Sequence, residues 1–452
     1  MWSSKKLFFR WWVIAVLIYL IFSAVVTRQY GTNFLMPLND DTVHHIQLAK
    51  NLINYRTFSL DGLNGKYETS PPKLTNFLTP GYALWLALIY IIFKSFIPAI
   101  FIGAIIFALS IPLTYLLAQE ITGNSKIAFW SALVFMVEPL SIYHSSLMFT
   151  EQLFVPVFLA GVYLFFRYIK EGNVKFLFVS AILFSVSTLI RPILFYFLPV
   201  LVFIVFFKEF KISIKHALIL GIISLVLAYS IIGIWLVRNK TVLNTWQISS
   251  NTGAILYGHH YEPLMRSLNL APGNPNVDNL DVFSPEYNKI LGNFAIGEIL
   301  KHKAQYLKLR LTYVPLFFLS NGYDNIVSRL TGTPGFDKYF RWDLISVISK
   351  GSFAQAFKMI LNIPKSIIAV LVGFLFWLFI SILALMGFWR LFKRKAGIDK
   401  RIVGFIGILI LYFDLITTPL ITARYRLPIN AFIFIFSVSG IYYLKDKIKQ
   451  WI

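Results

Sequence analysis

The stretch IIAVLVGFLFWLFISILALMGFW, residues 367–389, is long, apolar and free of charge. About 20 such residues in a helix cross the hydrocarbon core of a bilayer. The whole chain shares this character, because 57% of its 452 residues are hydrophobic, 14% are charged and the mean hydropathy is +0.69. These values exclude an ordinary soluble domain and predict a membrane protein.

Ten apolar runs of this kind occur along the chain. The sequence therefore predicts an all-α fold, a polytopic transmembrane helical bundle with about ten spans. The predicted spans cover residues 11–27, 97–118, 127–146, 151–168, 176–190, 193–207, 217–237, 367–389, 402–422 and 427–444. Two shorter apolar runs, 82–93 and 306–319, are predicted to be interfacial or re-entrant helices.

The distribution of Lys and Arg among the short loops predicts the orientation. Cytoplasmic loops are usually rich in these residues. The rich loops alternate along the chain and include both of its ends. We therefore expect a multi-pass protein of the cell (plasma) membrane with both termini cytoplasmic. The first apolar run lacks a small-residue processing site, so we expect it to remain as an anchor.

Two long polar segments, 28–80 and 238–363, fall on the opposite, external side. From them we predict three regions. Residues 1–237 form an N-terminal transmembrane region whose first external loop, 28–80, is catalytic. Residues 238–363 form a long external loop with an interfacial helix, and residues 364–452 form the C-terminal transmembrane helices.

The charge and the absence of cysteine narrow the function further. A net charge of +22 favours anionic lipid headgroups and phosphates as partners. Nucleic acid is excluded as a partner because the basic residues are scattered among the spans rather than gathered on one face. With no cysteine in the chain, disulfides and thiolate metal sites are excluded.

The sequence Asn39-Asp40-Asp41 places two adjacent carboxylates shortly after the first span, and an amphipathic helix is predicted to follow. One explanation is that Asn39 or Asp40 caps that helix. Two acids in tandem exceed what a cap requires, however. The functional interpretation makes Asp40 or Asp41 a general base that accepts a proton from an attacking hydroxyl.

Two histidines follow the acids, and their spacing adds a metal alternative. Asp40 and His44, like Asp41 and His45, are four residues apart and share a helix face. Asp40, Asp41 and His44 are therefore candidate ligands of a divalent metal ion. Adjacent histidines on a surface helix are more often solvated, and no cofactor is certain.

Further acidic and basic residues lie at the external helix ends. Glu151 opens a span as a second carboxylate or as a simple helix-start residue. The arginines at these ends are Arg191, Arg238, Arg424 and Arg426. Any one of them is explained by snorkelling, but several on the side poor in positive charge favour a shared phosphate ligand.

Aromatic and histidine side chains are the remaining candidates for substrate binding. Tyr257 lies in the long external loop beside His259 and His260, and Tyr425 lies between two of the arginines. With His44 and His45, Tyr257 and Tyr425 could line a polar site. Exposed loop residues of these types more often have no catalytic role.

Several short motifs along the chain resemble the GT-C membrane glycosyltransferases. The resemblance is to the family of protein O-mannosyltransferases and of the aminoarabinose transferase that acts on lipid A. Its pieces follow the family's order over almost the whole chain: the acid pair, QLAKNL (47–52), TPGYALWLAL (79–88), MFTEQLF (148–154), STLIRPIL (187–194), WLVRNK (235–240), NTGAILYG (251–258) and RYRLPI (424–429).

This resemblance implies a polyprenyl-phosphate sugar donor and transfer with inversion to an acceptor on the outer face. Asp40 matches the family's first-loop catalytic acid, with Asp41 as its neighbour, and Glu151 matches a second acidic position. Arg238 and Arg424, followed by Arg191 and Arg426, match basic positions for the donor phosphate. The chain departs from the family where His44 and His45 replace a common aromatic, which bears on the metal and the sugar.

Two other function classes compete with the transferase. A flippase or transporter of lipid-linked sugars is one, although its polar site would be expected near the midplane. A polymerase or ligase of lipid-linked glycans, with arginines and no carboxylate base, is the other. The acceptor of a transferase could be a glycan, a lipid or a protein.

Overall fold

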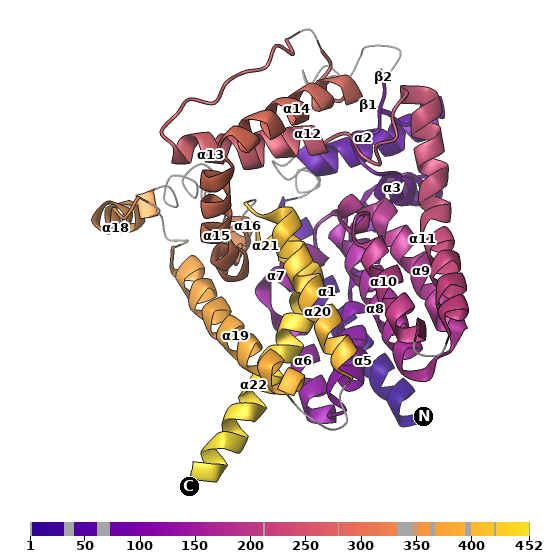
Figure 1. Cartoon of the computed structure of the whole chain (residues 1–452), viewed down its shortest axis with the longest axis vertical. Helices are drawn as coiled ribbons and strands as arrows, with labels where there is room; N and C mark the ends of the chain where they lie inside the picture. The colour runs from indigo at the N-terminus through magenta and orange to yellow at the C-terminus, as the bar shows by residue number, and fades with distance from the viewer. Residues whose placement is uncertain are drawn as a thin grey trace. The chain divides into compact units, whose positions relative to one another are not determined.

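The computed structural model describes residues 2–30, 40–60, 73–210, 213–278, 280–331, 347–348, 350–361, 367–393, 399–419 and 422–451. These residues are almost entirely helical (Figure 1), which confirms the predicted all-α membrane fold. The described strands are β1 (Ser59–Leu60) and β2 (Lys73–Leu74), which pair antiparallel with Ser59 opposite Leu74.

The chain divides into two compact units. Unit 1 contains Met1–Ser249, Leu383–Tyr412 and Pro428–Ile452, and unit 2 contains Ser250–Ile382 and Phe413–Leu427. The units follow packing rather than chain order, so the three predicted regions, with limits at residues 237 and 363, stay a prediction.

Unit 1 contains the two strands and most of the long helices. Its helices are α1 (Trp2–Tyr30), α2 (Asp40–Tyr55), α3 (Pro80–Phe93), α4 (Ile97–Phe107), α5 (Ser110–Thr122), α6 (Ser125–Val137), α7 (Pro139–Ser145), α8 (Glu151–Glu171), α9 (Val174–Ile190), η2 (Pro192–Leu194), α10 (Leu198–Phe210), α11 (Ile214–Leu243) and α22 (Asn430–Trp451).

Unit 2 holds most of the long polar segment that was predicted to be external. Its helices are α12 (Thr252–Ile255), the π-helix η3 (Leu256–Tyr261), α13 (Glu262–Ser267), α14 (Pro285–Lys301), α15 (Lys303–Leu319), α16 (Tyr323–Thr331), α18 (Phe353–Leu361) and α21 (Ala423–Arg426). Three further elements run across a boundary between the units: α19 (Ile367–Lys393), α20 (Lys400–Thr417) and η4 (Leu427–Ile429).

Six stretches of the described residues are helical, long and apolar enough to cross a membrane: Lys6–Arg28, Ile97–Thr122, Glu151–Glu171, Ile214–Leu243, Ile368–Lys393 and Ala423–Ile448. A bent pair, α6 with α7, raises the number to seven. The remaining predicted spans coincide with shorter helices, such as α9. The multi-pass character is therefore confirmed, and about ten spans stays a prediction.

The predicted span 127–146 is broken by 59° between α6 and α7. Pro139 has no N–H to continue a helix and disfavours helical backbone in the residue before it. Glu138 is accordingly extended, with φ −63° and ψ 125°, and its Oε2 accepts hydrogen bonds from the main-chain N (2.8 Å) and Oγ (2.9 Å) of Ser141. Glu138 thereby caps α7 and starts it in a new direction.

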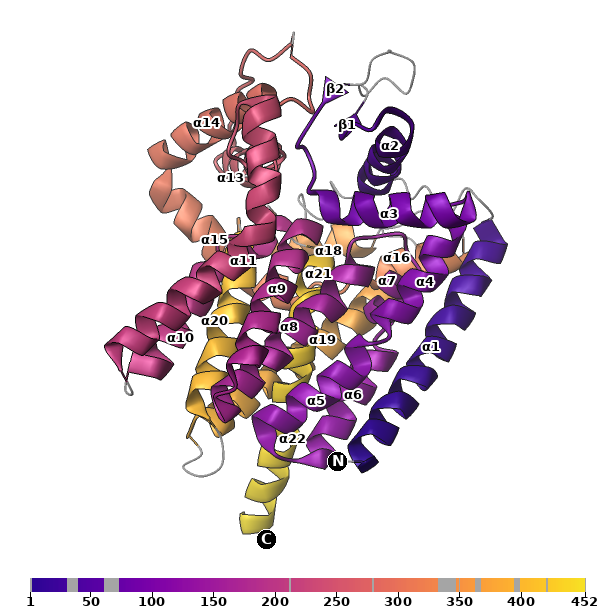
Figure 2. The ribbon, with the colours of Figure 1, turned by 90° about the vertical axis from the view of Figure 1, so that its right-hand side faces the viewer.

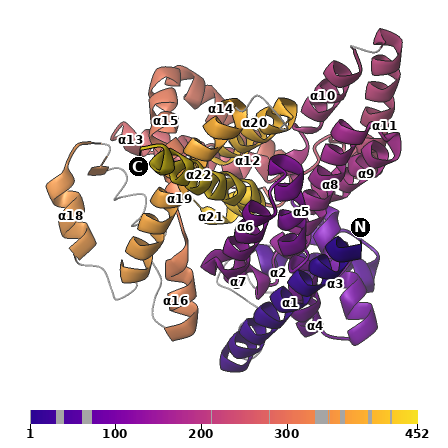
Figure 3. The ribbon, with the colours of Figure 1, turned by 90° about the horizontal axis from the view of Figure 1, so that it is seen from below.

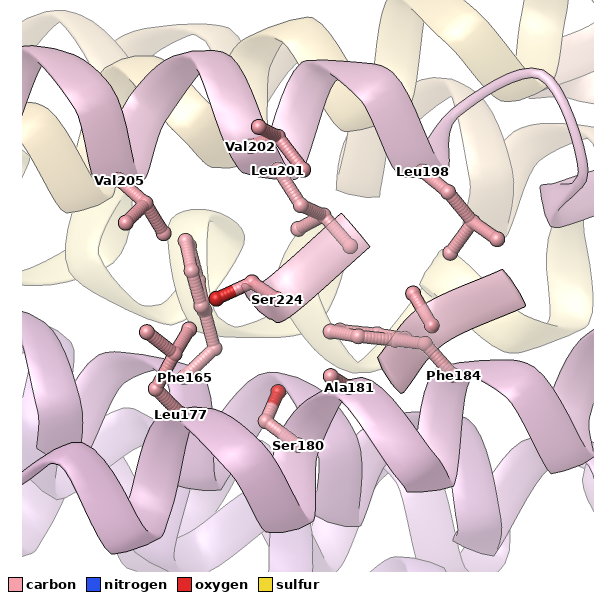
Figure 4. Close-up of a pocket in the computed structure, with 11 residues that line it drawn as sticks. Phe165, Leu177, Ser180, Ala181, Phe184, Leu198, Leu201, Val202, Val205 and Ser224 are labelled. Atoms are coloured by element: carbon pink, nitrogen blue, oxygen red, sulfur yellow. The ribbon is translucent and has the colours of Figure 1, made fainter. Parts of the chain in front are cut away.

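The core of unit 1 is formed by α8, α9, α10 and α11, which pack side by side (Figure 3). An apolar pocket lies among them (Figure 4). The Oγ of Ser180 donates to Gly161 O at 2.8 Å, and that of Ser224 to Leu220 O at 2.6 Å. Both hydroxyls are thus satisfied within the protein, so this pocket presents no polar group that would select a sugar or a phosphate.

Within unit 1, α2 and α3 lie at the end opposite the start of α1 and the end of α22 (Figures 1 and 2). Figure 2 shows α3 lying across the ends of neighbouring helices, an orientation typical of an interfacial helix.

Candidate functional site

The start of α2 is fixed to the loop between α7 and α8. Thr42 is fully buried, and its Oγ1 donates to Met148 O at 3.2 Å. Met148 precedes Glu151 by three residues. The acid pair at the start of α2 and the carboxylate at the start of α8, far apart in sequence, therefore occupy the same end of unit 1. The backbone of Asp40 begins α2, whereas its side chain and Asn39 lie outside the described residues.

Glu151 forms a buried ion pair with Arg191. The two side chains meet through Glu151 Oε1 and Arg191 Nη1, and the residues are 0% and 9% exposed. The Oγ1 of Thr150 donates to Glu151 Oε2 at 3.2 Å, and the Arg191 guanidinium lies 5.8 Å from the ring centre of Phe154. A charge buried this deeply needs its partner, because an unpaired one would cost several kcal/mol.

The start of α3 contacts the end of α9, next to Arg191. The Oγ1 of Thr79 donates to Ile190 O at 3.2 Å, and Ile190 is followed directly by Arg191. A Cβ added at Gly81 would lie 2.7 Å from Leu189 O, so the backbones approach too closely there for any other residue. Glycine at position 81 thus lets α3 press against the end of α9, beside Arg191.

His44 and His45 point from α2 towards residues around the start of α3. The ring of His45, which is buried, lies edge-on to Tyr82 with centres 5.0 Å apart. The ring of His44 lies edge-on to Phe77 at 5.8 Å. These aromatic contacts give both histidines a packing role, and their predicted binding to substrate stays a prediction.

Arg238, near the end of α11, joins the segment around β1 and β2 to the helical bundle. Its Nη1 donates to Thr75 O at 2.8 Å and its Nη2 to Phe58 O at 3.1 Å. The guanidinium also lies 5.0 Å from the ring centre of Trp235. Arg238 therefore holds the segment that carries Phe77, the neighbour of His44. Its predicted contact with a donor phosphate stays a prediction.

The other candidates belong to unit 2. Arg426 is fully buried, and its guanidinium donates to Phe317 O and Ser320 O at 2.7 Å each, and also to Phe318 O. It thereby satisfies the carbonyls at the end of α15, where positive charge is favoured, and it stacks 3.5 Å from the ring centre of Trp377.

Arg424 and Tyr425 are half-buried on α21. Tyr257 contacts the loop before α14, since its hydroxyl donates to Gly273 O at 2.7 Å. The convergence of Arg424, Tyr425, Arg426 and Tyr257 with the residues of unit 1 stays a prediction.

His260 lies in a buried polar chain that sequence reasoning did not anticipate. Its Nδ1 is 2.7 Å from the Tyr306 hydroxyl, which accepts from Arg310 Nη1 at 3.1 Å. Burial, together with the charge of Arg310 and with His259, lowers the pKa of His260 to about 4. The imidazole is therefore neutral at pH 7, and its Nδ1 shares a hydrogen bond with the Tyr306 hydroxyl.

The positions of the His, Asp and Glu side chains bear on the predicted metal site. Throughout the part of the chain that the structure describes, no three His, Asp or Glu side chains are grouped to hold a metal ion. The predicted ligands were Asp40, Asp41 and His44, and the Asp40 side chain is outside that part. The divalent metal therefore stays a prediction.

Comparison with known proteins finds a similarity that covers one part of the chain. Residues 78–235 match the family model for dolichyl-phosphate-mannose-protein mannosyltransferase. The match includes Glu151 and Arg191 but not Asp40 or Asp41. No curated protein sequence is significantly similar to the chain.

Two solved structures are similar to it. One is the archaeal oligosaccharyltransferase AglB from Archaeoglobus fulgidus in complex with an inhibitory peptide and a dolichol-phosphate, with a TM-score of 0.48 and 13% identity over 100% of this chain and 52% of AglB. The chain thus spans about half the length of AglB. The other is ArnT from Cupriavidus metallidurans bound to undecaprenyl phosphate, with a TM-score of 0.37 and 12% identity over 95% of this chain and 77% of ArnT. Both scores are too low for either structure to guide the function of this chain.

The family match covers the helices that carry the Glu151–Arg191 pair and the start of α3. It includes three of the sequence pieces quoted above in full: TPGYALWLAL, MFTEQLF and STLIRPIL. For residues 78–235, the predicted resemblance is thereby confirmed on the side of the protein mannosyltransferases.

Proposed function

We propose that the chain is a membrane glycosyltransferase that moves a sugar from a polyprenyl-phosphate donor to an acceptor on the outer face of the membrane. The hydrogen bond from Thr42 to Met148 O carries this proposal, because it joins the start of α2, with its two aspartates, to the loop that leads into Glu151. The match of residues 78–235 to a mannosyltransferase family supports the reaction class.

Asp40, with Asp41 as its neighbour, is the proposed general base. It takes the proton of the acceptor hydroxyl as that oxygen bonds to the anomeric carbon of the sugar. The bond between that carbon and the phosphate oxygen breaks on the opposite side, so the configuration inverts and polyprenyl phosphate leaves with both electrons. An inverting transfer of this kind needs one base and stabilisation of the leaving phosphate.

Glu151 takes a different part from Asp40 in this proposal. A carboxylate that already neutralises a buried arginine is a poor acceptor for a proton, because protonation would remove the buried ion pair with Arg191. We therefore assign Glu151 the task of holding Arg191 at the end of α9. Arg191, Arg238, Arg424 and Arg426 remain the proposed sources of positive charge for the donor phosphate.

The location of the site follows from the same proposal. In unit 1, the start of α1 and the end of α22 lie opposite α2 and α3 (Figures 1 and 2). With cytoplasmic termini, as the basic loops predict, α2 and α3 face the exterior of the plasma membrane. The sugar is a hexose or pentose, and the acceptor is a glycan, a lipid or a protein.

Release of polyprenyl phosphate tests the reaction. Purified protein in detergent is given a polyprenyl-phosphate sugar carrying radiolabel, and free carrier is measured over time. Asp40→Asn should lower the rate by about a hundredfold or more, the size of a lost general base. Asp446→Asn is the matched control, because Asp446 is exposed and pairs with Arg390 near the opposite end of unit 1.

The two rival functions give different results. A flippase would move the labelled lipid across a vesicle without producing free carrier, which would refute the transferase. A polymerase or ligase without a carboxylate base would leave the Asp40→Asn rate unchanged, and an unchanged rate would also refute the role of Asp40.

A further inference from the structure

The segment after α11 has an unusually well-anchored main chain. Four buried or half-buried side chains fix residues 247–249: Asn76 Nδ2 and Asn239 Nδ2 donate to Gln247 O at 3.1 and 2.9 Å, Trp235 Nε1 donates to Ile248 O at 2.8 Å, and Ser249 Oγ donates to Phe77 O at 2.6 Å. A backbone held this way loses little further freedom on binding a ligand.

On this fixed segment the side chains of Trp246 and Gln247 are exposed. Trp246 is 60% exposed, although an indole is among the side chains that gain most from burial. The neighbouring Ile248 and Ser249 are buried, so the segment is packed on one side and presents the Trp246–Gln247 pair on the other. Rigid support beneath an exposed aromatic is typical of a binding surface.

Anchoring in the membrane is the ordinary explanation for an exposed tryptophan at a span end. The contacts of this segment argue against it. Residues 245–248 fold back along the last turns of α11: Thr245 N donates to Asn239 O at 3.3 Å, Asn239 Nδ2 donates to Gln247 O, and Trp235 Nε1 donates to Ile248 O. At this level Arg238 donates to Phe58 O and Thr75 O, and Asn76 donates to Gln247 O. The polar segment around β1 and β2, rather than lipid, therefore packs beside the residues that flank Trp246.

The segment adjoins the candidate site of unit 1. Phe77 accepts from Ser249 through its carbonyl, and its ring contacts His44 of α2. Arg238, on the last turns of α11, donates to Thr75 O, two residues before Phe77. Residues on both sides of Trp246 are thus connected to the helix that begins with the acid pair.

We infer that Trp246 and Gln247 form a sugar-binding surface, with a neutral sugar ring as its ligand. The apolar face of a pyranose or furanose packs against the indole, and the Gln247 amide offers a donor and an acceptor to adjacent hydroxyls. This inference rests on the proposed function, since the ring belongs either to the donor or to the acceptor.

Binding is measured without turnover. Methyl α-mannopyranoside is titrated into the full chain in nanodiscs while tryptophan fluorescence is recorded, and the Trp246→Phe signal is subtracted to isolate Trp246 from the other ten tryptophans. We expect a saturable change that persists in Asp40→Asn and disappears in Gln247→Ala. Trp130→Ala, which removes another exposed tryptophan (49%) from α6, is the control and should retain it. No saturable change with this glycoside or with methyl β-glucopyranoside would overturn the inference.

Nanodiscs made with brominated lipids test the membrane alternative. Bromine quenches tryptophans that are inside the bilayer, so the isolated Trp246 signal should be unaffected. Quenching of that signal would show that Trp246 anchors the chain and would overturn the inference.

Steady-state kinetics then assign the ring. Trp246→Ala should raise the KM of one substrate by about tenfold, the loss of a contact worth about 1.4 kcal/mol, with little change in kcat, and Trp246→Phe should recover most of it. A rise for the acceptor or for the donor identifies which ring binds. An unchanged KM for both refutes the inference, whereas absent turnover in wild type together with glycoside binding would refute only the proposed function.

Discussion

The buried pair of Glu151 and Arg191 supports the sharpest prediction. Arg191→Gln removes the arginine that pairs with the Glu151 carboxylate, which is 0% exposed. Removing one partner from a buried ion pair costs about 3–5 kcal/mol, because a desolvated charge is left uncompensated. Glu151→Gln should cost a similar amount. The double variant removes both charges and should recover most of the free energy of unfolding.

Stability and activity separate the structural from the functional role. Unfolding of each variant is followed in detergent by denaturant titration, and release of polyprenyl phosphate is measured on the same preparations. We expect the double variant to be stable but less active than wild type, because Arg191, one of the four proposed sources of positive charge for the donor phosphate, is absent. If it regains activity, the pair has only a structural role.

The magnitude is open to refutation as well. A pair exposed to solvent contributes about 0–1 kcal/mol. Single variants that lose no more than this would show that the pair is solvated rather than buried, and the argument from burial would fail. Glu171→Gln is the matched control, because Glu171 pairs with Arg167 at the exposed end of α8.

Two further predictions concern packing and pH. Gly81→Ala should destabilise the chain and lower its activity, because the new Cβ would meet Leu189 O at 2.7 Å, whereas Gly233→Ala meets nothing within 4 Å and should be neutral or slightly stabilising; equal thermal midpoints for the two variants would contradict this. The depressed pKa of His260, about 4 against 6.5, gives stability that is complete above pH 6.5 and is lost as the pH falls towards 4, by at most about 3 kcal/mol. In His260→Gln, the denaturation midpoint should change less between pH 7 and pH 4 than it does in wild type. An equal dependence of the midpoint on pH in the two proteins would be inconsistent with a buried neutral histidine.

Much of the fold could be predicted from composition and periodicity. An apolar run such as 367–389 is expected to form a helix in the membrane. Lipid offers no hydrogen-bond partners to the backbone N–H and C=O groups, whereas a helix pairs these groups with one another. The break at Glu138 was missed, although Pro139 is a visible signal, because the apolar run continues across it and hydropathy alone reads one span.

The candidate site was only partly accessible in this way. Asp40 drew attention as one of two acids in tandem, Glu151 as a second carboxylate at a helix end, and Arg191 as an arginine on the side that is poor in positive charge. Nothing in the sequence marks Thr42 or Met148, whose hydrogen bond connects two of these regions. Arg426 was predicted to meet a phosphate, which stays a prediction, and nothing in the sequence marks the carbonyls at the end of α15 to which its guanidinium donates.

The sequence by itself determined that this is a membrane protein, that its fold is helical and which residue types stand at its helix ends. These features follow from local hydropathy and charge. Only the tertiary structure decided which of those residues meet. Glu151 pairs with Arg191, which is forty positions away, and α2 contacts the loop before α8. Packing between helices brings these residues together. Such contacts depend on side-chain shape and on glycines such as Gly81, and linear spacing does not encode them.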